Sequence, residues 1–158
     1  MTRSTVTSTK SRKTHGSLPA DITTFEVLVL ATMSAGKTSL INGLIGQELL
    51  HTANEATTAC LTRVEHRQGA RRFVHAVYCF NNTELAYKLS PSVELLRGWN
   101  ANAEVKSICL TGAFKVLPRP VSGLVLHDTP GPNNSQDERH ASLTLEAIRN
   151  VSFKALCY

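Results

Sequence analysis

The sequence contains no long apolar segment, no closely spaced pair of cysteines and few acidic residues. Its longest mainly apolar run, residues 27–33, is far shorter than the roughly 20 residues that a helix needs to cross a membrane. No apolar stretch follows the basic residues near the N-terminus, which argues against a secretory signal. The four cysteines form no C-x-x-C motif, so we expect buried free thiols rather than zinc ligands. These features predict a soluble, cytoplasmic protein, or at most one that is peripheral to a membrane.

The positive charge is concentrated at the N-terminus. Seventeen Lys and Arg against 12 Asp and Glu give a formal net charge of +5. Four of the basic residues lie in the first 20 positions, where no acid accompanies them: Arg3, Lys10, Arg12 and Lys13. Such a Ser/Thr-rich basic segment is typical of a solvated, disordered tail. We therefore expect a tail over residues 1–20, one domain over residues 21–158, and no specific nucleic-acid partner.

Hydrophobic patterning predicts alternating strands and helices. Residues 25–31 and 123–127 are almost continuously apolar, as in central parallel strands that are buried on both faces. Further strands are expected at 60–66 and 71–80, which would form a hairpin, and at 105–116 and 153–158; helices are expected at 37–50, 83–89, 92–100 and 137–150. This order indicates an α/β, three-layer sandwich with a mostly parallel sheet. Ligands bind such sheets at the carboxyl ends of the strands.

A phosphate-binding loop follows the first strand. Residues 31–38, A-T-M-S-A-G-K-T, match the P-loop pattern G-x-x-x-x-G-K-[ST] except that Ala31 replaces the first glycine. Gly36 would let the backbone approach a phosphate, Lys37 would supply charge between the β- and γ-phosphates, and Thr38 would bind magnesium. Ser39 would add a contact to the α-phosphate. The alternative is an ordinary strand–turn–helix with a solvated lysine, but a lysine in a first helical turn is unfavourable without a nearby anion.

A second polar loop follows the buried strand at 123–127. Asp128-Thr129-Pro130-Gly131 has the pattern D-x-x-G, in which Asp128 would hold the magnesium water shell and Gly131 would sense the γ-phosphate. The same residues also suit a simple turn. Between the two motifs, the Thr-rich segment 55–59 offers Thr58, or secondarily Thr57, as a further magnesium ligand.

Three strings of residues together resemble a bacterial dynamin-like GTPase over residues 24–158. They are M-S-A-G-K-T-S-L-I-N at 33–42, T-T-A at 57–59 and D-T-P-G-P-N at 128–133. The long segment 67–121 also fits the enlarged GTPase domains of that group. The resemblance implies GTP and Mg²⁺ as ligands and a homodimer through the GTPase face. It implies catalytic roles for Lys37, Ser34 and Thr58, nucleotide contacts from residues 34–39 (Ser34, Ala35, Gly36, Lys37, Thr38, Ser39), Asp128 and Gly131, and metal contacts from Thr38, Thr58 and Asp128.

The resemblance also implies details that depend on single residues. Ser34 matches a serine that helps to bind a monovalent cation, K⁺ or Na⁺, in place of an arginine finger. Met33 stands where eukaryotic dynamins have a catalytic glutamine, which puts the positioning of water in question. In the full-length relatives, further helices carry self-assembly and peripheral membrane contact.

Guanine recognition is the part of the family pattern that this sequence lacks. No [NT]-K-x-D motif follows Gly131, and no helical stalk is present. We therefore expect a partial GTPase domain, incomplete at its C-terminus, with slow or absent turnover. Two alternatives stay open: a non-hydrolysing nucleotide-binding or interaction fragment, and an ATP-using P-loop enzyme. The D-T-P-G string and the absence of an apolar run ending in two acids argue against the ATPase.

Overall fold

The computed structural model describes residues 24–31, 36–51, 60–117, 123–130, 138–151 and 153–157. The tail expected at 1–20 lies outside these ranges. So do several residues singled out from the sequence: Met33, Ser34, Ala35, Thr57, Thr58 and Gly131.

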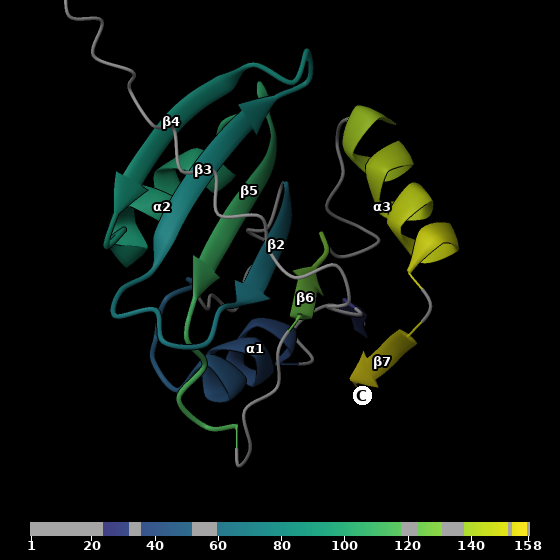
Figure 1. Cartoon of the computed structure of the whole chain (residues 1–158). Helices are drawn as coiled ribbons and strands as arrows, with labels where there is room; N and C mark the ends of the chain where they lie inside the picture. The colour runs from purple at the N-terminus through teal and green to yellow at the C-terminus, as the bar shows by residue number, and fades with distance from the viewer. Residues whose placement is uncertain are drawn as a thin grey trace, which may run out of the picture.

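The described residues form a seven-stranded sheet in the order β4-β3-β5-β2-β6-β1-β7 (Figure 1). Its strands are β1 (Phe25–Ala31), β2 (Leu61–His66), β3 (Val74–Cys79), β4 (Glu84–Leu89), β5 (Val105–Gly112), β6 (Leu124–Asp128) and β7 (Phe153–Cys157). Strand β1 is parallel to both of its neighbours, β6 and β7, and β2 is parallel to β5. The remaining pairs, β2–β6, β3–β4 and β3–β5, are antiparallel. The α/β class is confirmed.

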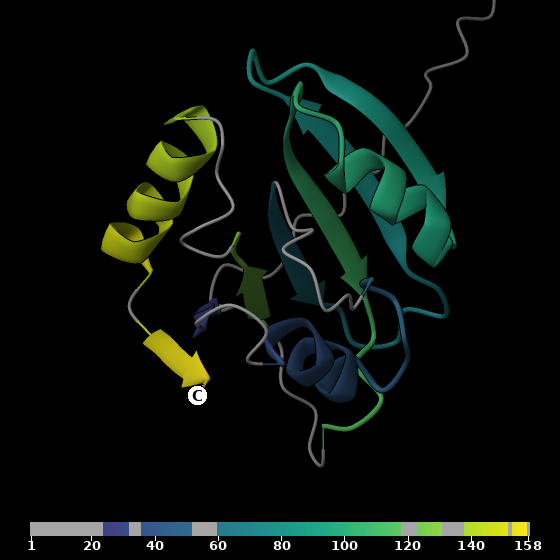
Figure 2. The same cartoon turned by 180° about the vertical axis from the view of Figure 1, so that it is seen from behind.

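Helices cover both faces of the sheet. Helices α1 (Lys37–Ile45) and α2 (Val93–Asn100) pack with Val29 into the larger hydrophobic cluster. Helix α3 (Glu138–Asn150) packs with Leu28 into a second cluster. Because successive residues of a strand point to opposite faces, Leu28 and Val29 place α3 and the α1–α2 pair on opposite sides. Figure 2 shows the sheet between them. The expected three-layer sandwich is confirmed.

Helix α1 begins where the sequence predicts but ends five residues earlier than expected. It stops because Gly46 takes a left-handed conformation, φ 77°, and its N–H bonds back to the carbonyls of Asn42 and Gly43. A Cβ at Gly46 would lie 2.7 Å from the Cβ of Lys115, so a larger residue does not fit there. The prediction of a helix over 37–50 is therefore wrong beyond Ile45.

The predicted hairpin between residues 60–66 and 71–80 is also wrong. Strand β5 lies between β2 and β3, and β3 forms its hairpin with β4 instead. The turn of that hairpin places Asn82 at φ 62°, and Asn81 accepts a hydrogen bond from the backbone N–H of Thr83. Asparagine tolerates the left-handed region better than most residues, which explains why the chain reverses here.

Residues 84–89 form the edge strand β4 rather than the predicted helix at 83–89. Leu85, Tyr87 and Leu89 alternate along it and remain exposed on one face, while Ala86 packs against the larger cluster from the other. This spacing of two is the strand period. The other predicted elements are confirmed, although the strand expected at 105–116 ends at Gly112.

Cys60, Cys79 and Cys109 are free thiols, as expected, but Cys79 and Cys109 are half-buried rather than buried. Cys60 is buried, and its burial raises the pKa of the thiol to about 12, so the thiol is protonated at neutral pH. Within the described ranges, no helix has the length and apolar character that crossing a bilayer requires.

Gly112 generates a prediction for stability. A Cβ at this position would meet the ring of Phe73 at 2.5 Å, and Phe73 is buried. We expect Gly112→Ala to lower the free energy of unfolding by about 1–3 kcal/mol, the usual cost of overpacking a core. Urea denaturation monitored by circular dichroism measures this change.

Gly98→Ala is the matched control. It lies in α2 with open space around the added carbon, so stability should stay the same or rise, because alanine favours a helix. An equal loss in both variants would contradict the argument from Phe73.

Candidate phosphate and magnesium site

The start of α1 carries no capping side chain among the described residues. Its N-cap is Gly36, at φ 73° and ψ 17°, and the first turn contains no acidic residue. The first backbone N–H groups of a helix have no partner within the helix, and their dipoles favour an anion. The sequence places Lys37, a cation, at the same end. This geometry suits a bound anion such as a phosphate.

Asp128 faces this helix end from the neighbouring strand. In the parallel β1–β6 ladder Asp128 pairs with Val29, so the carboxyl ends of both strands meet at one edge of the sheet. The Lys37 Nζ lies 2.9 Å from Asp128 Oδ1, and the Thr38 hydroxyl donates to Oδ2 at 3.2 Å. Two motifs that are 90 residues apart in the sequence therefore form one cluster.

The cluster is withdrawn from solvent. The side chains of Asp128 and Lys37 are 3% and 12% exposed. Burial raises the pKa of Asp128, while the Lys37 ammonium and the Thr38 hydroxyl act to lower it. Since burial is the largest influence, the ionised carboxylate depends on cationic partners, and Lys37 supplies one of them.

The oxygen donors fit a magnesium ion. Mg²⁺ commonly takes one or two protein oxygens and completes its shell with water and phosphate oxygens. Thr38 and Asp128 would be the residues that hold it, and the ion would neutralise charge on the phosphates. In the described parts of the chain, no group of three or more His, Cys, Asp or Glu residues is arranged to hold a metal.

Thr129 has a role that the sequence did not reveal. Its buried hydroxyl donates to the carbonyl of Val29 at 3.2 Å, which ties the chain after β6 to β1 just before the phosphate loop. The only sequence signal was a threonine within the D-T-P-G string, and that signal did not distinguish a structural hydroxyl from a turn residue.

Two side-chain amides, the buried Asn42 and the half-buried Asn100, fix the chain on either side of residues 52–59. Asn42 of α1 accepts from the backbone N–H groups of Leu49 and Leu50 and donates to the carbonyl of Leu50 at 2.7 Å. Asn100, at the end of α2, accepts from the N–H and the thiol of Cys60. The segment that contains Thr58 thus begins and ends at anchored positions beside the cluster. Asn42 stood within the resemblance string, but its contacts depend on where α1 ends.

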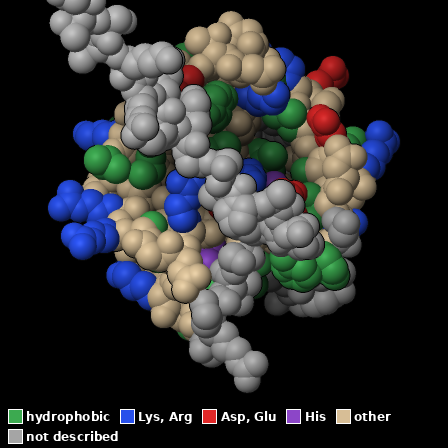
Figure 3. Space-filling view, in the orientation of Figure 1, with side chains coloured by type: hydrophobic (Ala, Val, Ile, Leu, Met, Phe, Trp, Pro, Cys, Tyr) green, Lys and Arg blue, Asp and Glu red, His purple; other side chains and the backbone are tan. Residues whose placement is uncertain are grey.

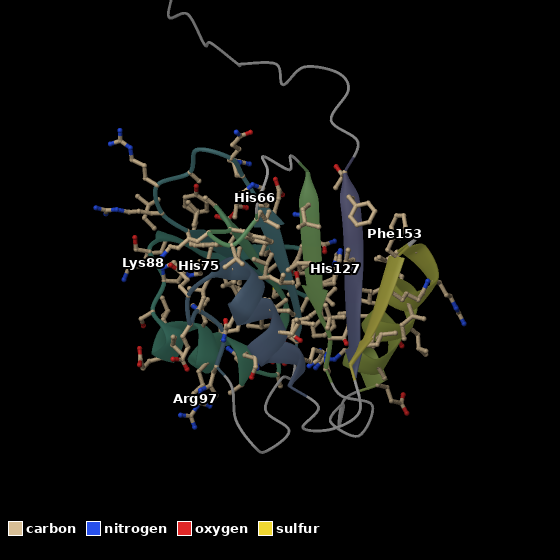
Figure 4. All side chains as sticks on the ribbon, turned by 90° about the horizontal axis from the view of Figure 1, so that it is seen from below. His66, His75, Lys88, Arg97, His127 and Phe153 are labelled. Atoms are coloured by element: carbon tan, nitrogen blue, oxygen red, sulfur yellow. The ribbon has the colours of Figure 1, made fainter. Side chains whose placement is uncertain are left out.

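A small hollow opens next to Asp128 and Thr38. It lies between α1, α2 and the strands β2 and β5, and Figure 4 shows Arg97 at the end of the sheet opposite His66. Its lining residues are Thr38, Leu50, His51, Thr62, Leu96, Arg97, Asn100, Ile108 and Asp128. Of these, Arg97 and His51 are polar side chains that sequence patterns gave no reason to select.

The structure therefore brings together part of the predicted site. Gly36, Lys37, Thr38 and Asp128 converge, and Ser39 lies exposed in the first turn of α1. Ser34, Ala35, Thr58 and Gly131 fall outside the described residues, so their roles stay predictions.

A strand that leads through a glycine into an uncapped helix, with lysine and threonine against a strand-end aspartate, defines an α/β domain of the P-loop class. The model of the Dynamin family matches residues 27–156, and the chain belongs to that family. The comparison with curated proteins gave no match.

Solved structures with the same fold include two chains of an oligomerised bacterial dynamin pair, described as a mechanism for the long-range sensing and tethering of membranes. Their TM-scores are 0.59 and 0.56, at 18% and 19% sequence identity. Each match covers 84% of this chain, but only 22% and 20% of the bacterial dynamin chains. This chain thus spans about a fifth of the length of those neighbours.

Proposed function

We propose that this protein binds GTP with Mg²⁺ and acts as a dynamin-type GTPase, in which residues 21–158 supply the phosphate and magnesium part of the site. The observation that carries the proposal is the contact of Lys37 and Thr38 with the buried Asp128 at the uncapped start of α1. Membership of the dynamin family supports GTP as the nucleotide.

The Lys37–Asp128 ion pair indicates how the site responds to a ligand. In the structure the two charges neutralise each other at 2.9 Å. A triphosphate needs the Lys37 ammonium, and a divalent cation needs the Asp128 carboxylate. When the triphosphate and the divalent cation both bind, Lys37 pairs with the phosphates and Asp128 pairs with the cation. Two buried ion pairs then replace one. Binding of the phosphates alone would leave Asp128 buried without its cation, which is costly. Nucleotide and Mg²⁺ should therefore bind cooperatively.

The remaining roles are proposed on the family resemblance. Hydrolysis would use Lys37 with Ser34 and Thr58, Ser34 would help to bind K⁺ or Na⁺, and Gly131 would sense the γ-phosphate. A homodimer through the nucleotide face and peripheral contact of a cytoplasmic protein with membranes are proposed in line with the oligomeric, membrane-tethering bacterial dynamins.

Equilibrium titration with fluorescent GTP and ATP, with and without Mg²⁺, tests the proposed ligand. We expect GTP to bind and Mg²⁺ to increase its affinity. Equal, weak binding of both nucleotides would contradict guanine recognition by this chain. No binding by a folded sample would leave only a role in protein interaction.

Lys37→Ala should reduce triphosphate affinity by at least about a hundredfold, because it removes the principal positive charge facing the phosphates. The same titration measures the loss, and circular dichroism checks the fold. Lys88→Ala removes an equal charge from the exposed strand β4 and should leave affinity unchanged. Retained affinity in Lys37→Ala would refute the assignment of the phosphate loop.

Asp128→Asn should abolish the increase in affinity that Mg²⁺ produces, while GTP affinity without Mg²⁺ stays equal or rises. The reason is that Asn keeps the shape of the side chain but frees Lys37 from its ion pair. Titration at several Mg²⁺ concentrations separates the two effects. Glu146→Ala, on an exposed part of α3, is the control and should keep the normal Mg²⁺ response. An unchanged response in Asp128→Asn would exclude Asp128 from the magnesium site.

A further inference from the structure

A second hollow lies at the end of the sheet away from Lys37. It has a volume of about 360 Å³, within the range of pockets that hold small molecules. Four segments meet there: the end of α1, the β2–β3 connection, the β4–α2 connection and the residues after β5. Its lining residues are Gln47, Leu49, Ala70, Arg71, Arg72, Phe73, Ser90, Pro91, Ala113 and Lys115. The antiparallel pairing of Thr62 with Asp128 puts the start of β2 at the nucleotide end and its far end at this hollow.

The charged side chains that line this hollow are all positive. Arg71, Arg72 and Lys115 line it, and no Asp or Glu does. Arg67, in the same β2–β3 connection, pairs with Glu65 at 3.7 Å, whereas the three lining cations make no side-chain ion pair with the described residues. The carbonyl of Ile45 at the end of α1 accepts a hydrogen bond from the backbone N–H of Lys115. The negative end of the helix dipole therefore offsets part of the positive charge of Lys115. Figure 3 shows Lys and Arg side chains at several places on this face of the molecule, including a group along its left edge.

The floor of the hollow consists of closely packed apolar side chains. Leu49, Phe73 and Pro91 are the buried apolar residues of the lining, and the Phe73 ring rests on Gly112, where a Cβ would meet it at 2.5 Å. Gly46 allows Lys115 the same close approach to α1.

Backbone strain marks the wall of the hollow. Ser90 is held at φ 52°, and its N–H donates to the carbonyl of Phe73 at 2.7 Å. A serine in the left-handed region costs of order 1 kcal/mol, and such strain is concentrated at functional sites. Ser90 thus adds a residue with a hydroxyl group to a lining that also contains Arg71 and Arg72.

We propose that this hollow is a second anion site, separate from the nucleotide site, which takes a phosphate monoester carried by a soluble metabolite or by a lipid headgroup. Arg71 and Arg72 bind the phosphate oxygens through their guanidinium groups, which match such anions in geometry. Lys115 adds charge and Ser90 a hydroxyl donor. The apolar floor of Leu49, Phe73 and Pro91 receives the carbon part of the ligand.

The first experiment locates binding by residue. ¹⁵N-labelled full chain, as wild type and as Lys37→Ala, is titrated with pyrophosphate and followed by NMR. In Lys37→Ala the phosphate loop is weakened, so the second site is observed by itself. We expect the amides of residues 70–73, 90 and 113–115 to shift with saturation in both proteins. Shifts confined to the start of α1, or absent from these segments in both proteins, would overturn the proposal.

The second experiment tests the cations. Arg71→Ala/Arg72→Ala should weaken pyrophosphate binding at these amides by about tenfold or more, through the loss of two charge-assisted contacts. Arg149→Ala/Lys154→Ala makes the same change in net charge at exposed positions of α3 and β7 and should have little effect. Equal weakening in both double variants would show only general charge attraction and would refute the site. Arg71→Lys/Arg72→Lys, which keeps charge and packing, should recover part of the affinity.

The third experiment separates the two sources of the phosphate. Phosphatidylcholine vesicles with phosphatidic acid, and vesicles without it, are floated with the wild type and with both alanine double variants. Flotation that needs phosphatidic acid and the Arg71–Arg72 pair, and that pyrophosphate prevents, assigns a lipid headgroup. Pyrophosphate binding without flotation assigns a soluble ligand. If pyrophosphate does not bind and the protein does not float with phosphatidic acid, the second anion site is excluded. The nucleotide titrations test the proposed function independently of this result.

Discussion

The contact between Lys37 and Asp128 requires that the end of β6 and the start of α1 lie side by side, and several parts of the structure keep them there. A buried carboxylate is stable only near positive charge or strong donors, and this carboxylate lies at the end of β6. Its cation comes from a different element, the first turn of α1. The two meet because β1 leads into α1 and β1 lies parallel beside β6. Removing that adjacency would leave Asp128 buried and unpartnered.

The sheet reinforces this adjacency. Thr129 donates across to the carbonyl of Val29, which fixes the chain after β6 against the last part of β1. On the two faces, Val29 and Leu126 pack into the larger cluster while Leu28 packs under α3. The charged groups thus rest on a frame whose stability comes mainly from apolar burial.

The sequence was informative where a feature is local and uninformative where it depends on distant contacts. The strand–glycine–helix order around Gly36 follows from a run of apolar residues and helical spacing, so it was predicted. The wrong hairpin arose because β5, which begins only at Val105, inserts between β2 and β3. Leu85 and Tyr87 have strand spacing, but on an exposed edge strand that signal is weak. The anchoring role of Asn42 could not be predicted, because it requires α1 to stop at Gly46.

Burial of Asp128 opposes its ionisation in the folded protein. Burial raises the pKa of this carboxyl despite Lys37 and Thr38, so the folded state binds the proton more tightly than the unfolded chain does. The free energy of unfolding therefore falls as the pH rises through the folded pKa, because ionisation of the buried carboxyl costs stability. The hydrophobic cluster behind it, with Ile41 and Ile45 fully buried, must offset this cost.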